Sequence, residues 1–147
     1  SDDAANILAH LPDGQADIIA FQQGVKDVVQ AILCEREGVD TVYSDWMDTL
    51  PAMIRMLQWE VDAGTLEESV RSPFMALMGS LWGALRTGGH AVINHYMFQL
   101  DLDWGYPPYL FENMLAMVRP WLQELAGARE IRLNDFNPQW WIILQKN

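Results

Sequence analysis

Cysteine, lysine and long apolar runs are scarce in this sequence. One cysteine, Cys34, occurs in 147 residues, which excludes an internal disulfide framework and any Cys₄ or Cys₂His₂ zinc site supplied by a single copy of the chain. Only Lys26 and Lys146 are lysines, and 9 basic side chains stand against 20 acidic ones. The net charge of −11 and the pI near 4.4 disfavour direct binding to nucleic acid, because both surfaces would be negative.

The longest uncharged stretch rich in apolar residues, from Pro73 to Leu85, covers 13 positions. A helix that spans a bilayer needs about 20, so we expect no membrane partner. The chain begins at Ser1 without a methionine, which leaves open a removed signal peptide. A single cysteine gives no sign of an oxidising compartment, and the expected localisation is cytoplasmic.

Length and composition favour one globular domain over residues 1–147. Half of the residues are hydrophobic and 20% are charged, which provides enough apolar surface for a core. The charge is unevenly spread, because residues 1–68 hold 14 acidic and 3 basic side chains whereas residues 69–147 hold six of each. The whole net charge therefore lies in the N-terminal part, an asymmetry that points to an interaction surface.

The acidic part, about residues 1–88, has apolar residues at helical spacing. Steps of three and four from Ile18 through Val25 to Ile32 predict one amphipathic helix. Proline and glycine residues between such stripes mark the expected helix ends. The helices expected on this basis cover residues 4–11, 13–37, 51–63 and 72–86.

Two local patterns bear on the boundaries of these helices. Thr65 and Glu68 fit a capping box, in which the threonine hydroxyl accepts from the Glu68 amide and the Glu68 carboxylate accepts from the Thr65 amide. Pro73 lacks an amide hydrogen and clashes with the preceding turn, so we expect a break or a kink there, with Ser72 capping a new helix. The Gly88-Gly89 pair is expected to end that helix.

The pattern changes after residue 89. Apolar side chains alternate with polar ones from residue 97 to residue 104, which predicts a half-buried strand. The elements expected here are a strand at 91–104, a helix at 109–125 and a hairpin of strands at 130–134 and 139–145. We therefore predict an α+β fold, in which N-terminal helices precede a β-α-β-β unit at about 90–147. Its sheet is expected to be three-stranded and mainly antiparallel, with those helices covering the second face.

No motif in the sequence names a reaction. Phosphate-loop, dinucleotide-binding and Gly-x-Ser-x-Gly patterns are missing, so we assign no catalytic residue and no cofactor. Asp101 and Asp103 are weak candidates for a metal site, because alternate positions of a strand place both carboxylates on one face. His95 shares their parity but would lie roughly 26 Å from Asp103 along a regular strand, too far for one ion. We therefore assign no metal.

Acidic residues around Trp46 form the best candidate for a binding surface. Aromatic side chains ringed by charge are enriched among binding hot spots, and Asp45 and Asp48 flank Trp46. We interpret the chain as a small acidic binding protein of an inhibitor, immunity or adaptor type. Its N-terminal helical face would contact a basic protein such as a toxin or a nucleic-acid-processing enzyme. The candidate partner-binding residues are Glu35, Glu37, Asp40, Asp45, Trp46 and Asp48.

Other interpretations remain at this point. Seven tryptophans would allow a Trp-lined pocket in which Asp101 and Asp103 serve a small enzyme or ligand-binding domain. Exposed tryptophan and methionine side chains would allow the chain to form a homodimer. The plainest explanation of the acids is a set of solvated helix faces, and Trp82 and Trp121, on apolar helix stripes, are expected in the core.

Overall fold

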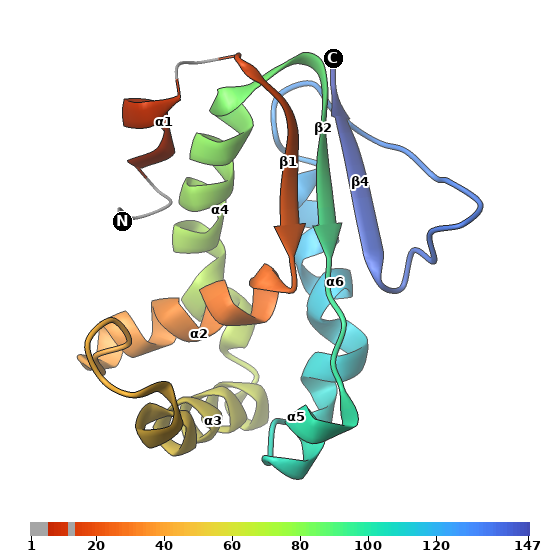
Figure 1. Cartoon of the computed structure of the whole chain (residues 1–147). Helices are drawn as coiled ribbons and strands as arrows, with labels where there is room; N and C mark the ends of the chain where they lie inside the picture. Colours follow the sequence, from red (N-terminus) through yellow and green to blue (C-terminus); the bar gives the residue numbers. More distant parts are fainter. Residues whose placement is uncertain (1–5, 12–13) are drawn as a thin grey trace.

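The computed structural model describes residues 6–11 and 14–147, and within them the chain forms six helices and four strands (Figure 1). The elements are α1 (Ile7–His10), β1 (Ala16–Gln22), α2 (Gly24–Glu37), α3 (Trp46–Ala63), α4 (Leu66–Ala84), β2 (Leu85–Asn94), α5 (Gln99–Asp103), α6 (Pro108–Leu122), β3 (Ala128–Glu130) and β4 (Trp141–Lys146). The predicted α+β class is confirmed. Residues 4 and 5 of the first expected helix lie outside the described part of the chain.

The four strands form one mixed sheet with the order β1-β2-β4-β3. Strands β1 and β2 are parallel, with Ile18 opposite His90, whereas β4 is antiparallel to both β2 and β3. The predicted sheet, three-stranded and mainly antiparallel, therefore has one strand too few. The helix predicted over 13–37 is, within the described residues 14–37, β1 followed by α2. The short apolar run from Ile18 to Phe21 fits both a helical stripe and a parallel strand, and periodicity alone does not separate the two.

Glycine allows β1 and β2 to approach closely. A Cβ atom on Gly89 would lie only 2.9 Å from two backbone carbonyl oxygens, and Gly88 has a φ of +82°, a conformation that favours glycine. The register of the two strands shifts nearby, between Ala16 and Ile18. The prediction that the Gly88-Gly89 pair ends a helix is therefore wrong, because both residues lie within β2.

Helices α4 and α6 pack against one face of the sheet (Figure 1). Phe21, Ile93 and Ile142 face this layer, and the last two are fully buried. On the opposite face Ile18 is 64% exposed, and no described helix covers it. The expectation that the N-terminal helices cover the second face is therefore wrong. Helix α4 shares the first face with α6, and α2 and α3 lie beyond the C-terminal ends of β1 and β2 (Figure 1).

Helix α4 continues through Pro73, so the helix does not break there and the predicted new helix capped by Ser72 is wrong. A proline at this position removes one backbone hydrogen bond. Val70 and Phe74 are fully buried on either side of it, and burial of this apolar stripe stabilises the helix by more than the lost bond costs. Among the described helices, α4 included, none is both long and apolar enough to cross a bilayer.

The short helix α5 stands where a strand was predicted. The Asp101 carboxylate accepts from the Phe98 amide at 2.9 Å, and the Asp101 amide donates to the Phe98 carbonyl at 3.0 Å. These reciprocal bonds close a turn locally, and they override the alternation of apolar side chains. The early part of the prediction is correct, because residues 91–94 belong to β2.

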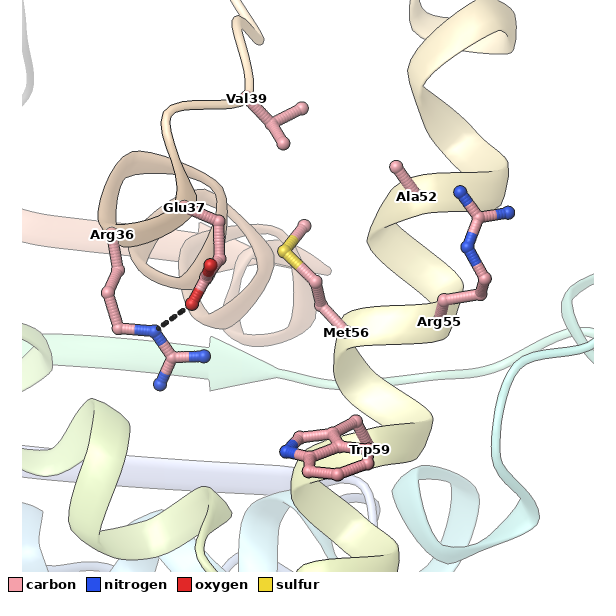
Figure 2. A pocket seen from close by; sticks show the side chains of 7 residues that line it. All are labelled: Arg36, Glu37, Val39, Ala52, Arg55, Met56 and Trp59. Atoms are coloured by element: carbon pink, nitrogen blue, oxygen red, sulfur yellow. Dashed lines mark hydrogen bonds and ion pairs between the residues drawn. The ribbon is translucent and has the colours of Figure 1, made fainter.

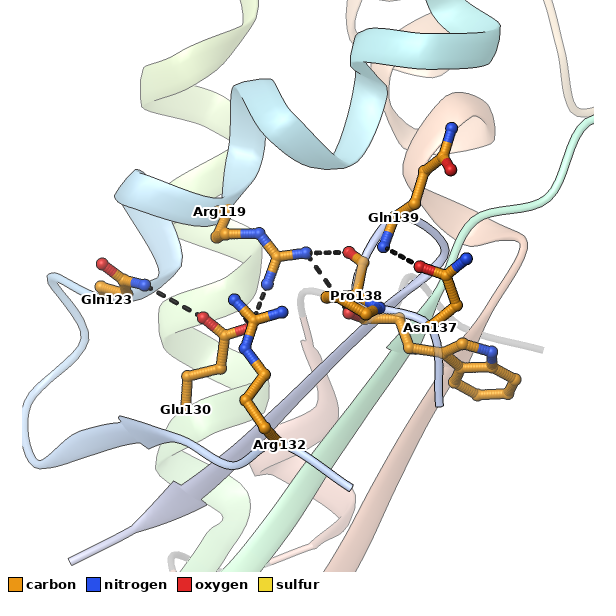
Figure 3. A network of polar contacts seen from close by, with 8 residues as sticks. Arg119, Gln123, Glu130, Arg132, Asn137, Pro138 and Gln139 are labelled. Atoms are coloured by element: carbon orange, nitrogen blue, oxygen red, sulfur yellow. Dashed lines mark hydrogen bonds and ion pairs between the residues drawn. The ribbon is translucent and has the colours of Figure 1, made fainter. Parts of the chain in front are cut away.

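The C-terminal prediction is confirmed in its main elements. Helix α6 precedes an antiparallel pair, β3 and β4, but β3 covers residues 128–130 and overlaps the strand predicted at 130–134 only at Glu130. Arg119 of α6 donates to the Glu130 carboxylate and to the Pro138 carbonyl (Figure 3). Arg132 also pairs with Glu130, at 3.2 Å. These contacts fasten the hairpin to α6.

The core contains both tryptophans that were predicted to lie in it. Trp82 is 5% exposed and Trp121 is 1% exposed. Trp121 contacts Phe74 edge-on, with ring centroids 6.0 Å apart, a favoured geometry for aromatic pairs. The apolar stripes of α4 and α6 are therefore joined at these residues.

Candidate partner-binding surface

The six predicted partner-binding residues lie at one turn of the chain. They occupy the C-terminal end of α2, the loop 38–45 and the first turn of α3, which we call the acidic corner (residues 35–48). All six are exposed, and Trp46 is 45% exposed. The structure therefore brings these residues into one region and leaves their side chains accessible.

Two of the acids also hold the corner in shape. The Asp40 carboxylate accepts from the amides of Val42 and Tyr43 at 2.9 and 3.1 Å. Backbone hydrogen bonds from Tyr43 and Val42 lower the pKa of Asp40 below its ordinary value. Asp45 accepts from the Met47 amide at 2.8 Å and caps α3. This cap is why α3 begins at Trp46, five residues earlier than predicted.

Apolar side chains project from the same corner. Val42 is 77% exposed, Tyr43 is 93% exposed and Met47 is 55% exposed. Sequence reasoning identified Trp46 but missed these three. A signal was available, because Val42 and Tyr43 lie between Asp40 and Asp45 and outside any helical stripe. Exposed aromatic and methionine side chains with charged neighbours are typical of the centre of a protein interface.

A groove of about 370 Å³ opens beside the corner, between the end of α2 and the outer side of α3 (Figure 2). Ala52, Met56 and Trp59 form its α3 wall at helical spacing, and Trp59 is 72% exposed. Arg55 lines it without an ion pair among the described residues, and Arg36 lines it while bonded to Glu37 at 2.8 Å. Two of the three bases of the N-terminal part therefore lie at this groove.

A buried carboxylate anchors the corner to the rest of the helices. Glu60 is 3% exposed and accepts from the Thr65 and Ser69 hydroxyls at 2.6 and 2.8 Å and from Arg36 at 2.7 Å. Burial alone would raise the pKa of Glu60, but these hydrogen bonds outweigh it and the pKa is lowered. The capping box predicted for Thr65 and Glu68 does not form, because the Thr65 hydroxyl donates to Glu60 instead.

A second pocket, of about 430 Å³, is lined by residues of α2, the loop and α3. Its lining includes Lys26 and Asp27 of α2, Thr41 of the loop, and Trp46 and Met53 of α3. Since Trp46 belongs to both the pocket and the acidic corner, the two are continuous.

A cluster of polar side chains lies next to this pocket. Lys26 pairs with Asp101 at 2.9 Å, and the Tyr106 hydroxyl donates to Gln30 at 2.5 Å. Burial is the largest cause that raises the pKa of Tyr106 to about 12. His95 is 2% exposed, and neither of its ring nitrogens has a hydrogen-bond partner among the described residues. Burial, aided by the Lys26 charge, lowers the pKa of His95 to about 4.

The two aspartates considered for a metal site have separate environments. Asp101 is buried in its pair with Lys26, whereas Asp103 is exposed and accepts from Gln99 at 3.0 Å. Because both lie on a helix, the one-face argument for a strand no longer applies. Over residues 6–11 and 14–147, no three His, Cys, Asp or Glu side chains are grouped so as to hold a metal ion.

Aromatic side chains also gather at the start of the loop that follows β2. Tyr96 contacts Phe98 and Trp140 with centroid distances of 5.7 and 5.2 Å, and Phe111 contacts Trp140 at 5.4 Å. Tyr96 is 47% exposed and Phe98 is 59% exposed. We call these four residues the aromatic patch.

Comparison of the chain with family models, with curated proteins and with solved structures gives no significant match. A functional conclusion therefore rests on the surface of this molecule alone. That surface has one corner where exposed acids, exposed aromatic side chains and an internally bonded loop occur together.

Proposed function

We propose that the chain is a binding protein, of an inhibitor, immunity or adaptor type, that contacts a basic protein through the acidic corner. The observation that carries this proposal is the exposure of Tyr43, Trp46 and Met47 among acids whose loop is held by its own hydrogen bonds. A loop ordered before binding loses less conformational entropy when a partner contacts it.

Charge supports the choice of a basic partner. Glu35 and Asp48 make no ion pair among the described residues, so their charges are available to a partner. Complementary charge accelerates encounter between proteins, and apolar side chains at the centre then slow dissociation. An enzyme that acts on nucleic acid needs positive charge near its site, and a surface of this kind would occlude it.

Affinity capture with a charge-neutralised control tests this proposal. The test bait carries Glu35→Gln, Glu37→Gln and Asp48→Asn, which spare the loop-holding acids Asp40 and Asp45. The matched control bait carries Asp103→Asn, Glu112→Gln and Asp135→Asn, three exposed acids outside the corner.

We expect the wild type and the control to retain the same basic protein from an extract of the source organism, and the test bait to lose it. The association rate of that protein should fall by about tenfold or more in the test variant and should decrease with added salt. Equal retention by all three baits, or an association rate indifferent to salt, would refute the proposal.

Self-association is a second candidate, favoured by the aromatic patch. Phe98 and Tyr96 expose apolar surface that a second copy of the chain could cover. Light scattering at high concentration tests this directly. A dimer mass that reverts to a monomer in Phe98→Ser supports it, and a monomer mass for the wild type ends it.

A further inference from the structure

The second pocket contains one carboxylate, that of Asp27, which makes no ion pair among the residues that the structure describes. Asp27 is exposed at this pocket and accepts a long hydrogen bond, 3.3 Å, from Gln30. Lys26, its neighbour in the chain, lies 2.9 Å from Asp101 instead, and its ammonium group is 4.4 Å from the centre of the Tyr106 ring. Together Lys26, Asp27 and Asp101 carry a net charge of −1.

An aromatic ring stands in the same pocket. Trp46 lines it together with Met53 and Ala31. Trp104 of the α5 end contacts Trp46 edge-on, with centroids 5.4 Å apart and planes at 65°. This contact restricts the Trp46 ring before any ligand arrives. A cation near the face of a tryptophan is attracted by the negative potential of the ring.

We propose that this pocket receives the guanidinium or ammonium group of an arginine or lysine side chain from the basic partner; the inference rests on the proposed function. Asp27 supplies the counter-charge, Trp46 the aromatic surface, and Thr41 a hydroxyl that accepts from the bound group. Such a side chain would be an anchor of the interface, because buried arginine and tryptophan contacts dominate binding energy in many complexes.

The charges of the pocket favour a cation over an anion. An anionic group would meet Asp27 at the pocket, and the Lys26 ammonium that might attract it is already engaged by Asp101. Loss of surrounding water raises the pKa of Asp27, with Asp101 adding to the rise and Lys26 opposing it. A bound cation would reverse that shift, since an opposite charge stabilises the ionised carboxylate.

Titration with a single side-chain analogue tests the pocket without the partner. The probe is Nα-acetyl-arginine amide, and the matched control probe is Nα-acetyl-citrulline amide, which has nearly the same shape and no charge. Indole resonances of the full chain, followed by NMR, report the result, and the Trp46 signal is assigned by its loss in Trp46→Leu. The protein variants are Asp27→Asn and, as a matched loss of one exposed charge outside the acidic corner, Asp135→Asn.

We expect saturable shifts of the Trp46 indole with the arginine probe in the millimolar range, and none with citrulline. Asp27→Asn should weaken binding by about tenfold or more, whereas Asp135→Asn should change it less than twofold. Shifts that are equal for both probes, or that survive Asp27→Asn, would overturn the inference. A spermidine titration distinguishes a side chain of a protein partner from a free polyamine as the bound cation. Much tighter binding of spermidine than of the arginine probe would assign the pocket to a free polyamine and overturn the inference.

The two proposals fail in different ways. If a basic partner requires the acidic corner but tolerates Asp27→Asn, the pocket inference fails and the proposed function stands. If the arginine probe binds through Asp27 but no basic protein requires the corner, the proposed function fails. Thermal denaturation of each variant confirms that the chain remains folded in every arm.

Discussion

Charged residues serve different purposes in the C-terminal part of the molecule and at the acidic corner. In the C-terminal part they pair with groups of the same chain: Arg71 with Glu124, Arg119 with Glu130, and Lys146 with two backbone carbonyls. At the corner, Glu35 and Asp48 have no such partner among the described residues. The balanced part therefore uses charge to hold the fold together, and the acidic part leaves charge available for contact. Substitutions in the two regions should differ in their effect on stability.

The largest effect is expected at the ion pair between α6 and the hairpin. Arg119→Ala leaves the Glu130 carboxylate, whose side chain is 11% exposed, without its main partner, and should lower the free energy of unfolding by about 3 kcal/mol. Chemical denaturation measures this. Arg129→Ala, an exposed arginine of β3 bonded only to Gln145, is the control and should cost less than about 1 kcal/mol.

A nearly equal effect is expected from acid, through the buried side chain of His95. Its folded-state pKa of about 4 is below the unfolded value of about 6.5, so the unfolded chain takes up the proton first. The stability that follows from the neutral ring is complete above about pH 6.5 and is lost as the pH falls towards 4, by up to about 3 kcal/mol.

The pH dependence of unfolding for the wild type and for His95→Gln gives the measurement. The variant should lose about 2 to 3 kcal/mol less than the wild type between pH 7 and pH 4. His90→Gln, which replaces a histidine of β2 and keeps His95, is measured in the same way for comparison. Parallel curves for the wild type and His95→Gln would contradict the prediction that His95 causes the loss of stability in acid.

A smaller effect is expected where the acidic part does use a charge internally. Glu60→Gln keeps an acceptor for the Thr65 and Ser69 hydroxyls but removes the charge that faces Arg36. The variant should be less stable by about 2 kcal/mol, because a hydrogen bond to a charged group is worth more than a neutral one. Asp62→Asn, an exposed acid of the same helix, should fall within about 0.5 kcal/mol of the wild type.

The smallest effect on stability is expected at the corner itself. Glu35→Gln and Asp48→Asn remove charges that no described residue compensates, so the free energy of unfolding should change by less than about 0.5 kcal/mol in either direction. Denaturation curves that show a large loss in these variants would mean that the corner acids support the fold, and the contrast between the two regions would disappear.

The C-terminal elements and the position of the acidic corner could be predicted from local patterns. The reason is that α6, the hairpin and the acids around Trp46 are each defined by residues close together in the sequence. The errors have physical causes that local patterns do not contain. Strand β1 is defined by its pairing with β2, whose residues lie far along the chain. The α5 turn depends on one carboxylate that bonds back to Phe98. The exposure of Tyr43 is a different case, because its position between Asp40 and Asp45 was a local signal, and the general tendency of aromatic residues to be buried outweighed it in the prediction.

The parallel pairing of Ile18 with His90 closes a chain segment of about 70 residues, and this long closure has a consequence for the order of folding. Contacts among α2, α3 and α4 join nearer parts of the chain, so they are expected to form before β1 finds β2. Strand β1 forms one edge of the sheet and pairs with β2, so it can separate without breaking the pairing of β2 with β4. The acidic corner is attached to α2 and α3 rather than to β1. It should therefore stay folded while the backbone amide hydrogens of β1 exchange with solvent.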